Sequence, residues 1–178
     1  MRPISAPFPG TRFRRLRRSA ALRALAQENH LALGDLIWPV FVRDGQGVED
    51  PIASMPGVNR LSIDKVVQAA EQAASLGIPA ICLFPYTDPA LKTEACEEAW
   101  NPENLTNRAI RAIKAAVPEI AVMTDVALDP YTSHGQDGLL DESGYILNDP
   151  TVAVLREQAL VQAAAGVDIV APSDMMDG

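Results

Sequence analysis

Short apolar runs alternate with longer amphipathic stretches through most of this chain, and this alternation limits the possible folds more than any other feature. The apolar runs have the length of buried strands and cover residues 36–42, 80–84, 120–126 and 167–171. In the stretches between them, apolar residues recur every three or four positions, as on one face of a helix. These stretches cover residues 62–76, 102–117 and 149–165. Apolar strands separated by amphipathic helices are typical of an α/β fold with a parallel sheet.

Residues at the edges of the amphipathic stretches support their assignment as helices. Types that favour helix starts stand at the beginning of each stretch, and these are Ser62, Pro102 and the pair Asp149–Pro150. Two stretches are followed by glycine, which commonly ends a helix, at Gly77 and Gly166. Within the first apolar run, Pro39 weakens the strand assignment because proline cannot donate a hydrogen bond to a neighbouring strand.

Two architectures fit this order of elements, an open doubly wound sheet and part of a (β/α)8 barrel. The doubly wound sheet would carry a glycine-rich phosphate loop after its first strand. Residues 43–50 do not have that pattern, and residues 45–57 are expected to form a loop. A complete barrel needs about 250 residues. Four strands in 178 residues therefore predict the first half of a TIM barrel, over residues 35–178.

The first 34 residues are predicted to form a basic arm, with a short helix over residues 19–26. Seven arginines and no acidic residue occur in the first 27 positions, whereas the rest of the chain has eight basic and 23 acidic residues. Such an arm could bind nucleic acid or an anionic membrane, or act as a transit peptide. We favour a third interpretation, in which the arm packs on an acidic surface of its own or a neighbouring subunit.

Two negative features limit the location of the protein. No stretch approaches the roughly 20 apolar residues of a membrane-spanning helix. Cys82 and Cys96 form neither a disulfide framework nor a metal-binding spacing, which favours a reducing, cytoplasmic location.

Reactive groups of a barrel enzyme lie at the carboxyl ends of its strands. Four segments qualify, at residues 43–44, 85–88, 125–137 and 173–174. The third is the densest, since Asp125, Asp129, His134 and Asp137 place three carboxylates and an imidazole close together, and carboxylates suit Mg²⁺.

Each of these residues also has a structural interpretation. Asp129 precedes a proline and Asp137 precedes a glycine, as turn residues often do. His134 is expected to make a hydrogen bond within its loop. The pair Ser173–Asp174 could cap a helix. The three lysines that follow the arm lie in predicted helices or loops, so none of them ends a strand in a dry pocket where it could act as a nucleophile.

Residues 124–138, with the sequence TDVALDPYTSHGQDG, closely resemble the metal-loop signature of the porphobilinogen synthase (5-aminolevulinate dehydratase) family. Further motifs of that family follow the same order along the chain, at residues 14–17, 36–42, 54–57, 83–85, 148–150 and 171–178. The resemblance covers nearly the whole chain.

The resemblance implies a (β/α)8 barrel whose N-terminal arm embraces a neighbouring subunit in a homo-oligomer, commonly an octamer. The implied reaction condenses two 5-aminolevulinate molecules to porphobilinogen with loss of two waters, through Schiff bases on two lysines. Asp125 would be an active-site carboxylate, and Ser173 and Asp174 would be substrate-binding neighbours. An active-site loop carrying Tyr131, Thr132 and His134 would lie over the site.

Two departures from the family pattern change these expectations. Zinc-dependent members have three cysteines at positions matching Ala127, Asp129 and Asp137, and this chain has none of them. The resemblance therefore argues against a catalytic zinc, and it favours Mg²⁺, a monovalent cation or no active-site metal, with Asp129 and Asp137 as candidate ligands.

The second departure is length, because both Schiff-base lysines and the substrate-carboxylate ligands would follow Gly178. We therefore expect the chain to be part of the full-length enzyme and to be inactive on its own. The alternative is a non-catalytic truncated subunit that binds intact subunits through its arm and open sheet edges. Neither interpretation involves nucleic acid or a membrane.

Overall fold

The computed structural model describes residue 7 and residues 9–178. The chain divides into two compact units, Met1–Ala32 and Leu33–Gly178, and each is described by itself. Arg2, one of the arginines of the predicted arm, lies outside the described residues.

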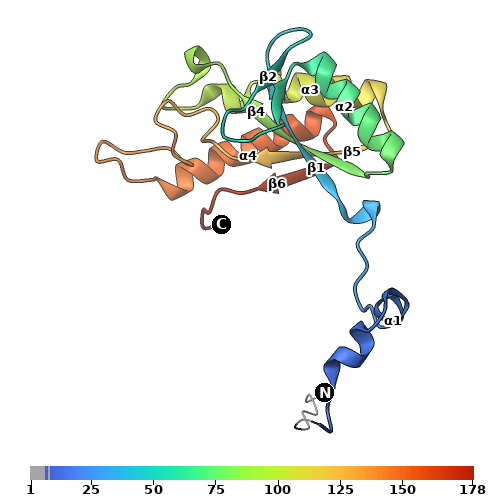
Figure 1. The fold of residues 1–178 in the computed structure, drawn as a ribbon. Helices are drawn as coiled ribbons and strands as arrows, with labels where there is room; N and C mark the ends of the chain where they lie inside the picture. The colour runs from blue at the N-terminus through green and yellow to red at the C-terminus, as the bar shows by residue number, and fades with distance from the viewer. Residues whose placement is uncertain (1–6, 8) are drawn as a thin grey trace. The chain divides into compact units, whose positions relative to one another are not determined.

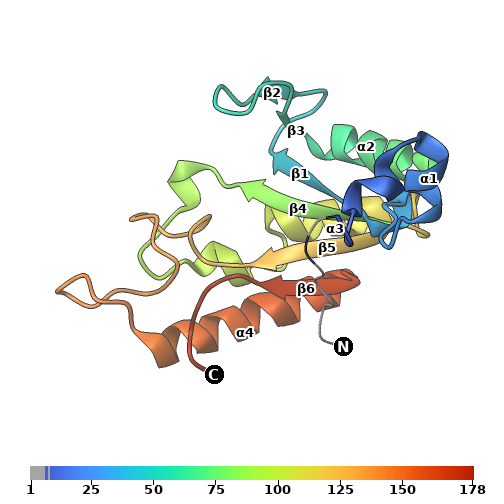
Figure 2. The same ribbon diagram turned by 60° about the horizontal axis from the view of Figure 1, so that its bottom comes forward.

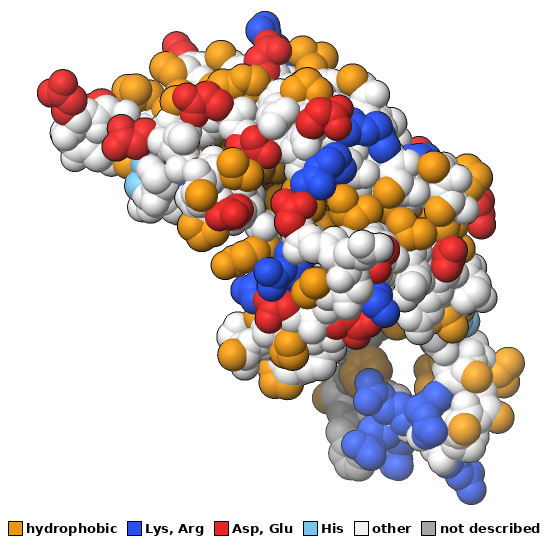
Figure 3. Space-filling view, turned by 90° about the horizontal axis from the view of Figure 1, so that it is seen from above, with side chains coloured by type: hydrophobic (Ala, Val, Ile, Leu, Met, Phe, Trp, Pro, Cys, Tyr) orange, Lys and Arg blue, Asp and Glu red, His pale blue; other side chains and the backbone are white. Residues whose placement is uncertain are grey.

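The N-terminal unit contains a 3-10 helix, η1 (Phe13–Arg17), and a short helix, α1 (Ala20–Leu25). The Ser19 hydroxyl accepts a hydrogen bond of 3.2 Å from the backbone N–H of Leu22 and caps α1, which confirms the predicted helix. No side chain of η1 or α1 is buried. Figure 3 shows the resulting cluster of exposed arginine side chains.

The second unit is built on one sheet with the strand order β2-β3-β1-β4-β5-β6 (Figures 1 and 2). The strands are β1 (Ile37–Arg43), β2 (Glu49–Pro51), β3 (Asn59–Leu61), β4 (Ala80–Tyr86), β5 (Ala121–Val126) and β6 (Ile169–Pro172). The helices are α2 (Ile63–Leu76), α3 (Leu105–Ala116) and α4 (Asn148–Ala165), with short 3-10 helices at η2 (Leu33–Asp35), η3 (Pro89–Leu91) and η4 (Glu97–Trp100).

The four long strands distinguish between the two predicted architectures. β1, β4, β5 and β6 are parallel neighbours in chain order, and a helix precedes each new strand. A doubly wound sheet would reverse its direction of growth after the first strands. This sheet adds each long strand on the same side of the preceding one, as a (β/α)8 barrel does.

The sheet has two more strands than predicted. β2 and β3 pair antiparallel with each other, and β3 pairs parallel with β1 at Phe41 and Val42. β2 falls inside the predicted loop, so that part of the prediction was wrong. Both strands are three residues long and largely polar, and their pairing depends on tertiary contacts more than on an apolar pattern. Pro39 is accommodated within β1, at a position where β4 is the paired neighbour.

Two helix starts also differ from the prediction. Pro102 lies outside α3, which begins at Leu105 because the Asn104 side chain caps it by accepting the Asn107 N–H. α4 begins at Asn148, two residues before Pro150. Left-handed glycines end α2 and α4 as predicted, at Gly77 and Gly166.

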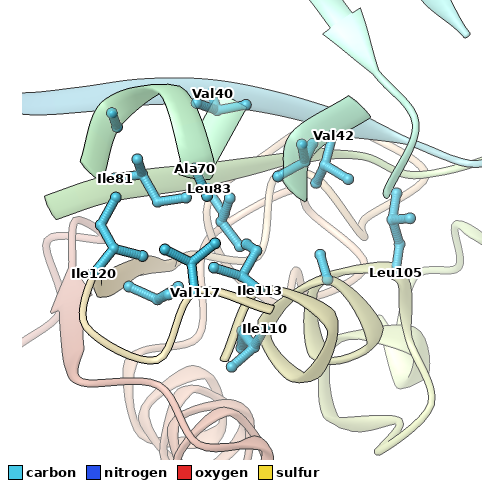
Figure 4. Packing of buried hydrophobic residues seen from close by; sticks show 14 residues of the cluster. Val40, Val42, Ala70, Ile81, Leu83, Leu105, Ile110, Ile113, Val117 and Ile120 are labelled. Atoms are coloured by element: carbon cyan, nitrogen blue, oxygen red, sulfur yellow. The ribbon is translucent and has the colours of Figure 1, made fainter. Parts of the chain in front are cut away.

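The main core lies between the sheet and helices α2 and α3 (Figure 4). Alternate strand residues point into it, and these are Val40, Val42, Ile81, Leu83 and Val122. The intervening residues, including Phe41, Phe84 and Met123, therefore belong to the opposite face of the sheet. On that face the Phe41 and Phe84 rings lie 5.7 Å apart. In the described part of the chain, no helix is long and apolar enough to cross a membrane.

Candidate active site at the carboxyl ends of β5 and β6

Asp125 and Ser173 meet at the carboxyl ends of two adjacent strands. Asp125 is the penultimate residue of β5 and pairs in register with Ala171 of β6. Ser173 follows β6, and its hydroxyl donates a hydrogen bond of 2.7 Å to Oδ1 of Asp125. Since side chains alternate along a strand, Asp125 lies on the sheet face opposite the buried Thr124. The sheet thus brings together two residues that were predicted to share a site.

Three further carboxylates form a cluster next to this pair. Asp129, Asp137 and Asp174 each place a carboxylate oxygen within 4.8 Å of the other two. Asp174 follows β6 and is held by the segment after β5, because its Oδ2 accepts a hydrogen bond of 3.0 Å from the backbone N–H of Leu128. The first two residues were predicted as a pair, and the structure adds Asp174 to them.

The carboxylates of this cluster destabilise each other's charged forms. Burial, with the added negative charges of Asp137, Asp129 and Asp125, raises the pKa of Asp174 to about 7. Partial desolvation and the charges of Asp137 and Asp125 also raise the pKa of Asp129. A bound cation would offset this repulsion.

The donor set fits a hard cation better than zinc. All three candidate ligands are carboxylates, which suit Mg²⁺ and related ions, whereas structural and catalytic zinc sites rely on thiolate or imidazole. Neither cysteine belongs to this cluster, and burial raises the pKa of Cys82 to about 11 and that of Cys96 to about 12.

The loop residues that were predicted to cover the site make mostly internal contacts. Tyr131 is 2% exposed, packs in a second apolar cluster, and its hydroxyl lies 3.1 Å from the Thr106 hydroxyl. Thr132 is also buried and donates a hydrogen bond to the carbonyl of Gln136. His134 Nδ1 accepts the Gln136 N–H, which is the loop hydrogen bond expected from its position. These residues fix the shape of the loop.

The strand ends of β1 and β4 are engaged in other contacts. Arg43 forms an ion pair of 2.7 Å with Asp50, and Asp44 forms one of 2.7 Å with Arg108. The Tyr86 ring lies under the guanidinium of Arg60. The densest group of acidic side chains at the carboxyl edge therefore belongs to the β5 and β6 segments.

Sequence reasoning missed two buried glutamines that contact the carboxyl end of β5. Gln158 and Gln162 lie four residues apart on α4, and each is 1% exposed. Both donate side-chain hydrogen bonds to backbone carbonyls of the β5 segment. The sequence gives little signal for them, because the buried residues of α4 are mostly polar, namely Thr151, Leu155, Gln158 and Gln162.

A parallel sheet that grows in one direction, with acidic side chains gathered at its carboxyl edge, defines part of a (β/α)8-barrel enzyme. The family model described as delta-aminolevulinic acid dehydratase matches residues 10–178, and the chain belongs to this family.

Curated relatives and a solved structure agree with this assignment. The chain is 60% identical over 165 residues to the delta-aminolevulinic acid dehydratase of Bradyrhizobium diazoefficiens, and 55% identical over 175 residues to that of Rhodobacter capsulatus. These matches cover 93% and 98% of this chain but 46% and 52% of the relatives. The chain thus spans about half the length of these relatives.

The solved structure is the Toxoplasma gondii delta-aminolevulinic acid dehydratase (porphobilinogen synthase) in complex with the reaction product porphobilinogen. It matches with a TM-score of 0.90 and 48% identity, over 99% of this chain and 49% of that one. The half-barrel predicted from the sequence is confirmed by this likeness.

Proposed function

We propose that this chain forms the first half of the barrel of a porphobilinogen synthase. The complete protein would condense two molecules of 5-aminolevulinate to porphobilinogen, with loss of two waters. The observation that carries this proposal is the Asp125–Ser173 hydrogen bond at the carboxyl edge of β5 and β6. Membership of the family supports the reaction type.

Asp125 is the residue to which we assign proton chemistry. 5-Aminolevulinate carries a primary amine, and a carboxylate beside that amine can orient it or accept its proton. Ser173 would hold one carboxylate oxygen in place, and Ser173 and Asp174 would line the substrate pocket. Tyr131, Thr132 and His134 would shape the covering loop from within. The lysines that form Schiff bases with substrate are assigned to the second half of the barrel.

Asp129 and Asp137 would hold the cation, with Asp174 as a third ligand. We propose Mg²⁺ or a monovalent cation rather than zinc, because the donor atoms are carboxylate oxygens. When bound, such a cation supplies positive charge that stabilises nearby anionic oxygens. The residues present fit that role, since burial and, to a lesser extent, the charges of neighbouring carboxylates raise the pKa values of Asp129 and Asp174.

Borohydride trapping tests the proposed reaction. The complete protein is incubated with 5-aminolevulinate, reduced with borohydride and analysed by intact mass. The expected adduct adds the mass of the substrate less one oxygen atom, because Schiff-base formation releases one water and reduction adds two hydrogens. The 178-residue chain should give no specific adduct under the same conditions. Absence of an adduct on the complete protein would contradict the proposed function, and turnover by the isolated chain would contradict the division of roles.

The complete protein is also proposed to be a cytoplasmic homo-oligomer, with an octamer as the expected size. Support for an arm-mediated contact comes from the described arginines of the N-terminal unit, between Arg12 and Arg23, which are exposed and have no acidic residue among them. The two free, buried cysteines favour a reducing compartment. Deletion of residues 1–32 should lower the number of subunits per oligomer, which analytical ultracentrifugation gives as the ratio of oligomer mass to subunit mass. An unchanged number of subunits would contradict the arm's role.

A second candidate function is a non-catalytic subunit that binds intact subunits. The observation in its favour is the exposure of apolar side chains on β6, where Ile169 is 39% exposed and Val170 is 41% exposed. Within the described sheet, β6 pairs on one side, with β5. Exposed strand edges promote association. Co-elution of this chain with the complete protein on size exclusion would support the second function, and separate elution would count against it.

A further inference from the structure

The helix α4 buries polar side chains where a helix of an α/β fold normally buries apolar ones. Gln158 and Gln162 are both 1% exposed. Burying an amide costs free energy unless the amide is hydrogen-bonded. The hydrogen-bond partners of these two side chains therefore indicate their role.

Gln162 holds the backbone of β5 at the position of the candidate catalytic carboxylate. Its Nε2 donates a hydrogen bond of 3.0 Å to the backbone carbonyl of Asp125. Its Oε1 accepts one of 2.8 Å from the Thr124 hydroxyl. The side chain of Thr124 points toward α4 and that of Asp125 points away from it. Gln162 therefore fixes the strand from behind, at the residue whose carboxylate faces the site.

Gln158 repeats this contact two residues further along the chain. Its Nε2 donates a hydrogen bond of 3.1 Å to the carbonyl of Ala127. Its Oε1 is buried and has no hydrogen-bond partner within the described residues. The Gln158 side chain also interacts with the Tyr131 hydroxyl, so this amide contacts the loop as well as the end of β5.

Few hydrogen bonds between strands hold the backbone where the two glutamines bind it. The pairing of β4 with β5 ends at Thr124, and the pairing of β5 with β6 ends at Val126. Asp125 is therefore paired on one side, and Ala127 lies beyond the last paired residue. Two residues later the chain reaches Asp129 of the carboxylate cluster. The glutamines supply hydrogen bonds where the sheet no longer does.

We propose that Gln158 and Gln162 are positioning residues for the reaction, an amide pair that sets the placement of Asp125 and Asp129 by holding the carbonyls of Asp125 and Ala127. This inference rests on the proposed function for its catalytic consequence. The proposed anchoring of the end of β5 by α4 can be measured without an activity assay.

The test compares three variants of the complete protein. Gln158→Met and Gln162→Met keep side-chain length and remove the hydrogen bonds. Leu155→Ala is the matched control, because Leu155 is buried on the same helix in an apolar cluster. Loss of a group that orients active-site residues typically costs 10- to 100-fold in activity. We expect kcat to fall by roughly 10- to 100-fold in the methionine variants, with KM changed by less than about twofold. Leu155→Ala should lower the melting temperature and keep kcat within about twofold of wild type.

Hydrogen–deuterium exchange of the peptide covering residues 124–130 gives a second readout that needs no activity. Exchange there should be at least about tenfold faster in the methionine variants than in Leu155→Ala, because Leu155 shares an apolar cluster with Val126 and Leu128 but makes no side-chain hydrogen bond to the strand. If wild type makes no porphobilinogen, the proposed function fails while this exchange still tests the anchoring. Folded methionine variants with wild-type kcat would overturn the positioning role, and wild-type exchange in them would overturn the anchoring.

Discussion

The Ser173 hydroxyl donates its hydrogen bond to Asp125 across 48 positions of the chain. The contact exists because β5 and β6 are paired with Asp125 opposite Ala171, which leaves Ser173 two residues further along on the same face. The bond ties the ends of two strands together and restricts the Asp125 carboxylate. It therefore links the register of the sheet to the geometry of the site.

Replacing Ser173 by Ala in the complete protein should lower kcat by roughly tenfold, because the Asp125 carboxylate loses the group that orients it. The free energy of unfolding should change by no more than about 1 kcal/mol, since Ser173 is exposed. Steady-state kinetics and urea denaturation measure the two effects. Ser173→Thr retains the hydroxyl and serves as the control. An unchanged kcat in Ser173→Ala would show that the hydrogen bond has no catalytic role.

The architecture could be predicted from the sequence because it depends on periodic patterns. The four long strands are continuous apolar runs, and the helices between them carry regular apolar stripes, so the local signals agree with the final fold. β2 and β3 could not be predicted, since three-residue polar strands acquire their structure from neighbours that are distant in the chain.

The site was only partly predictable for a similar reason. Asp129 and Asp137 are close in sequence and could be grouped, whereas Asp174 joins them only through the pairing of β5 with β6. Gln158 and Gln162 were missed because the apolar positions of α4 indicate a different stripe from the mostly polar side that the structure buries. The position of Ser173 and Asp174 after the last predicted strand made them candidates, and motif resemblance gave them a substrate-binding role.

Asp174→Asn should make the chain more stable above pH 7. The folded-state pKa of Asp174, about 7, lies above the ordinary value near 3.8, so folding favours the protonated form. Stability associated with this group is therefore present at low pH and is lost as pH rises from about 4 to about 7. Asparagine removes that loss, because its carbonyl can still accept the Leu128 N–H without carrying charge.

The expected gain is about 1–2 kcal/mol at pH 8 in the absence of divalent cations, reduced from the full shift because the side chain is partly exposed to solvent. Urea denaturation at pH 5 and pH 8 measures the effect. The difference between wild type and variant should be larger at pH 8 than at pH 5. Equal differences at the two pH values would mean that Asp174 does not titrate with a raised pKa.

Asp168→Asn should have the opposite pH dependence. Asp168 Oδ2 accepts hydrogen bonds from the Val122 N–H at 2.8 Å and from Lys114 Nζ at 2.9 Å, which joins the start of β5 to the segment before β6. The backbone bond from Val122 and the contact with Lys114 lower the pKa of Asp168. Its stabilising contribution is present above the unfolded-state pKa and is lost as pH falls through the lower folded-state value.

The substitution should cost about 0.5–1 kcal/mol at pH 7, reduced by solvent screening because the Asp168 side chain is 39% exposed, and progressively less as the pH falls below 4. Chemical denaturation across this range measures the change. Lys114→Met, which removes the other partner, should reproduce part of the loss at pH 7. A cost for Asp168→Asn that persists undiminished at pH 2 would contradict the assignment of the effect to the charged carboxylate.

Magnesium should stabilise the chain through the carboxylate cluster. The cation offsets the repulsion among Asp129, Asp137 and Asp174, and a ligand present at about 100 times its Kd stabilises the folded state by about 2.7 kcal/mol. Thermal denaturation with increasing MgCl2, at constant ionic strength maintained with a tetraalkylammonium salt, measures the effect. The double variant Asp129→Asn, Asp137→Asn removes two of the three charges and should lose the magnesium-dependent shift.

The double variant should also be at least as stable as wild type without added cation, because it no longer brings like charges together. The magnesium response and the cation-free stability of the double variant together distinguish two roles for Asp129 and Asp137, as cation ligands or as turn residues. Carboxylates that only shape the loop would leave the magnesium response intact and would lower stability when replaced. A magnesium-dependent shift of equal size in wild type and in the double variant would place the cation elsewhere on this acidic chain.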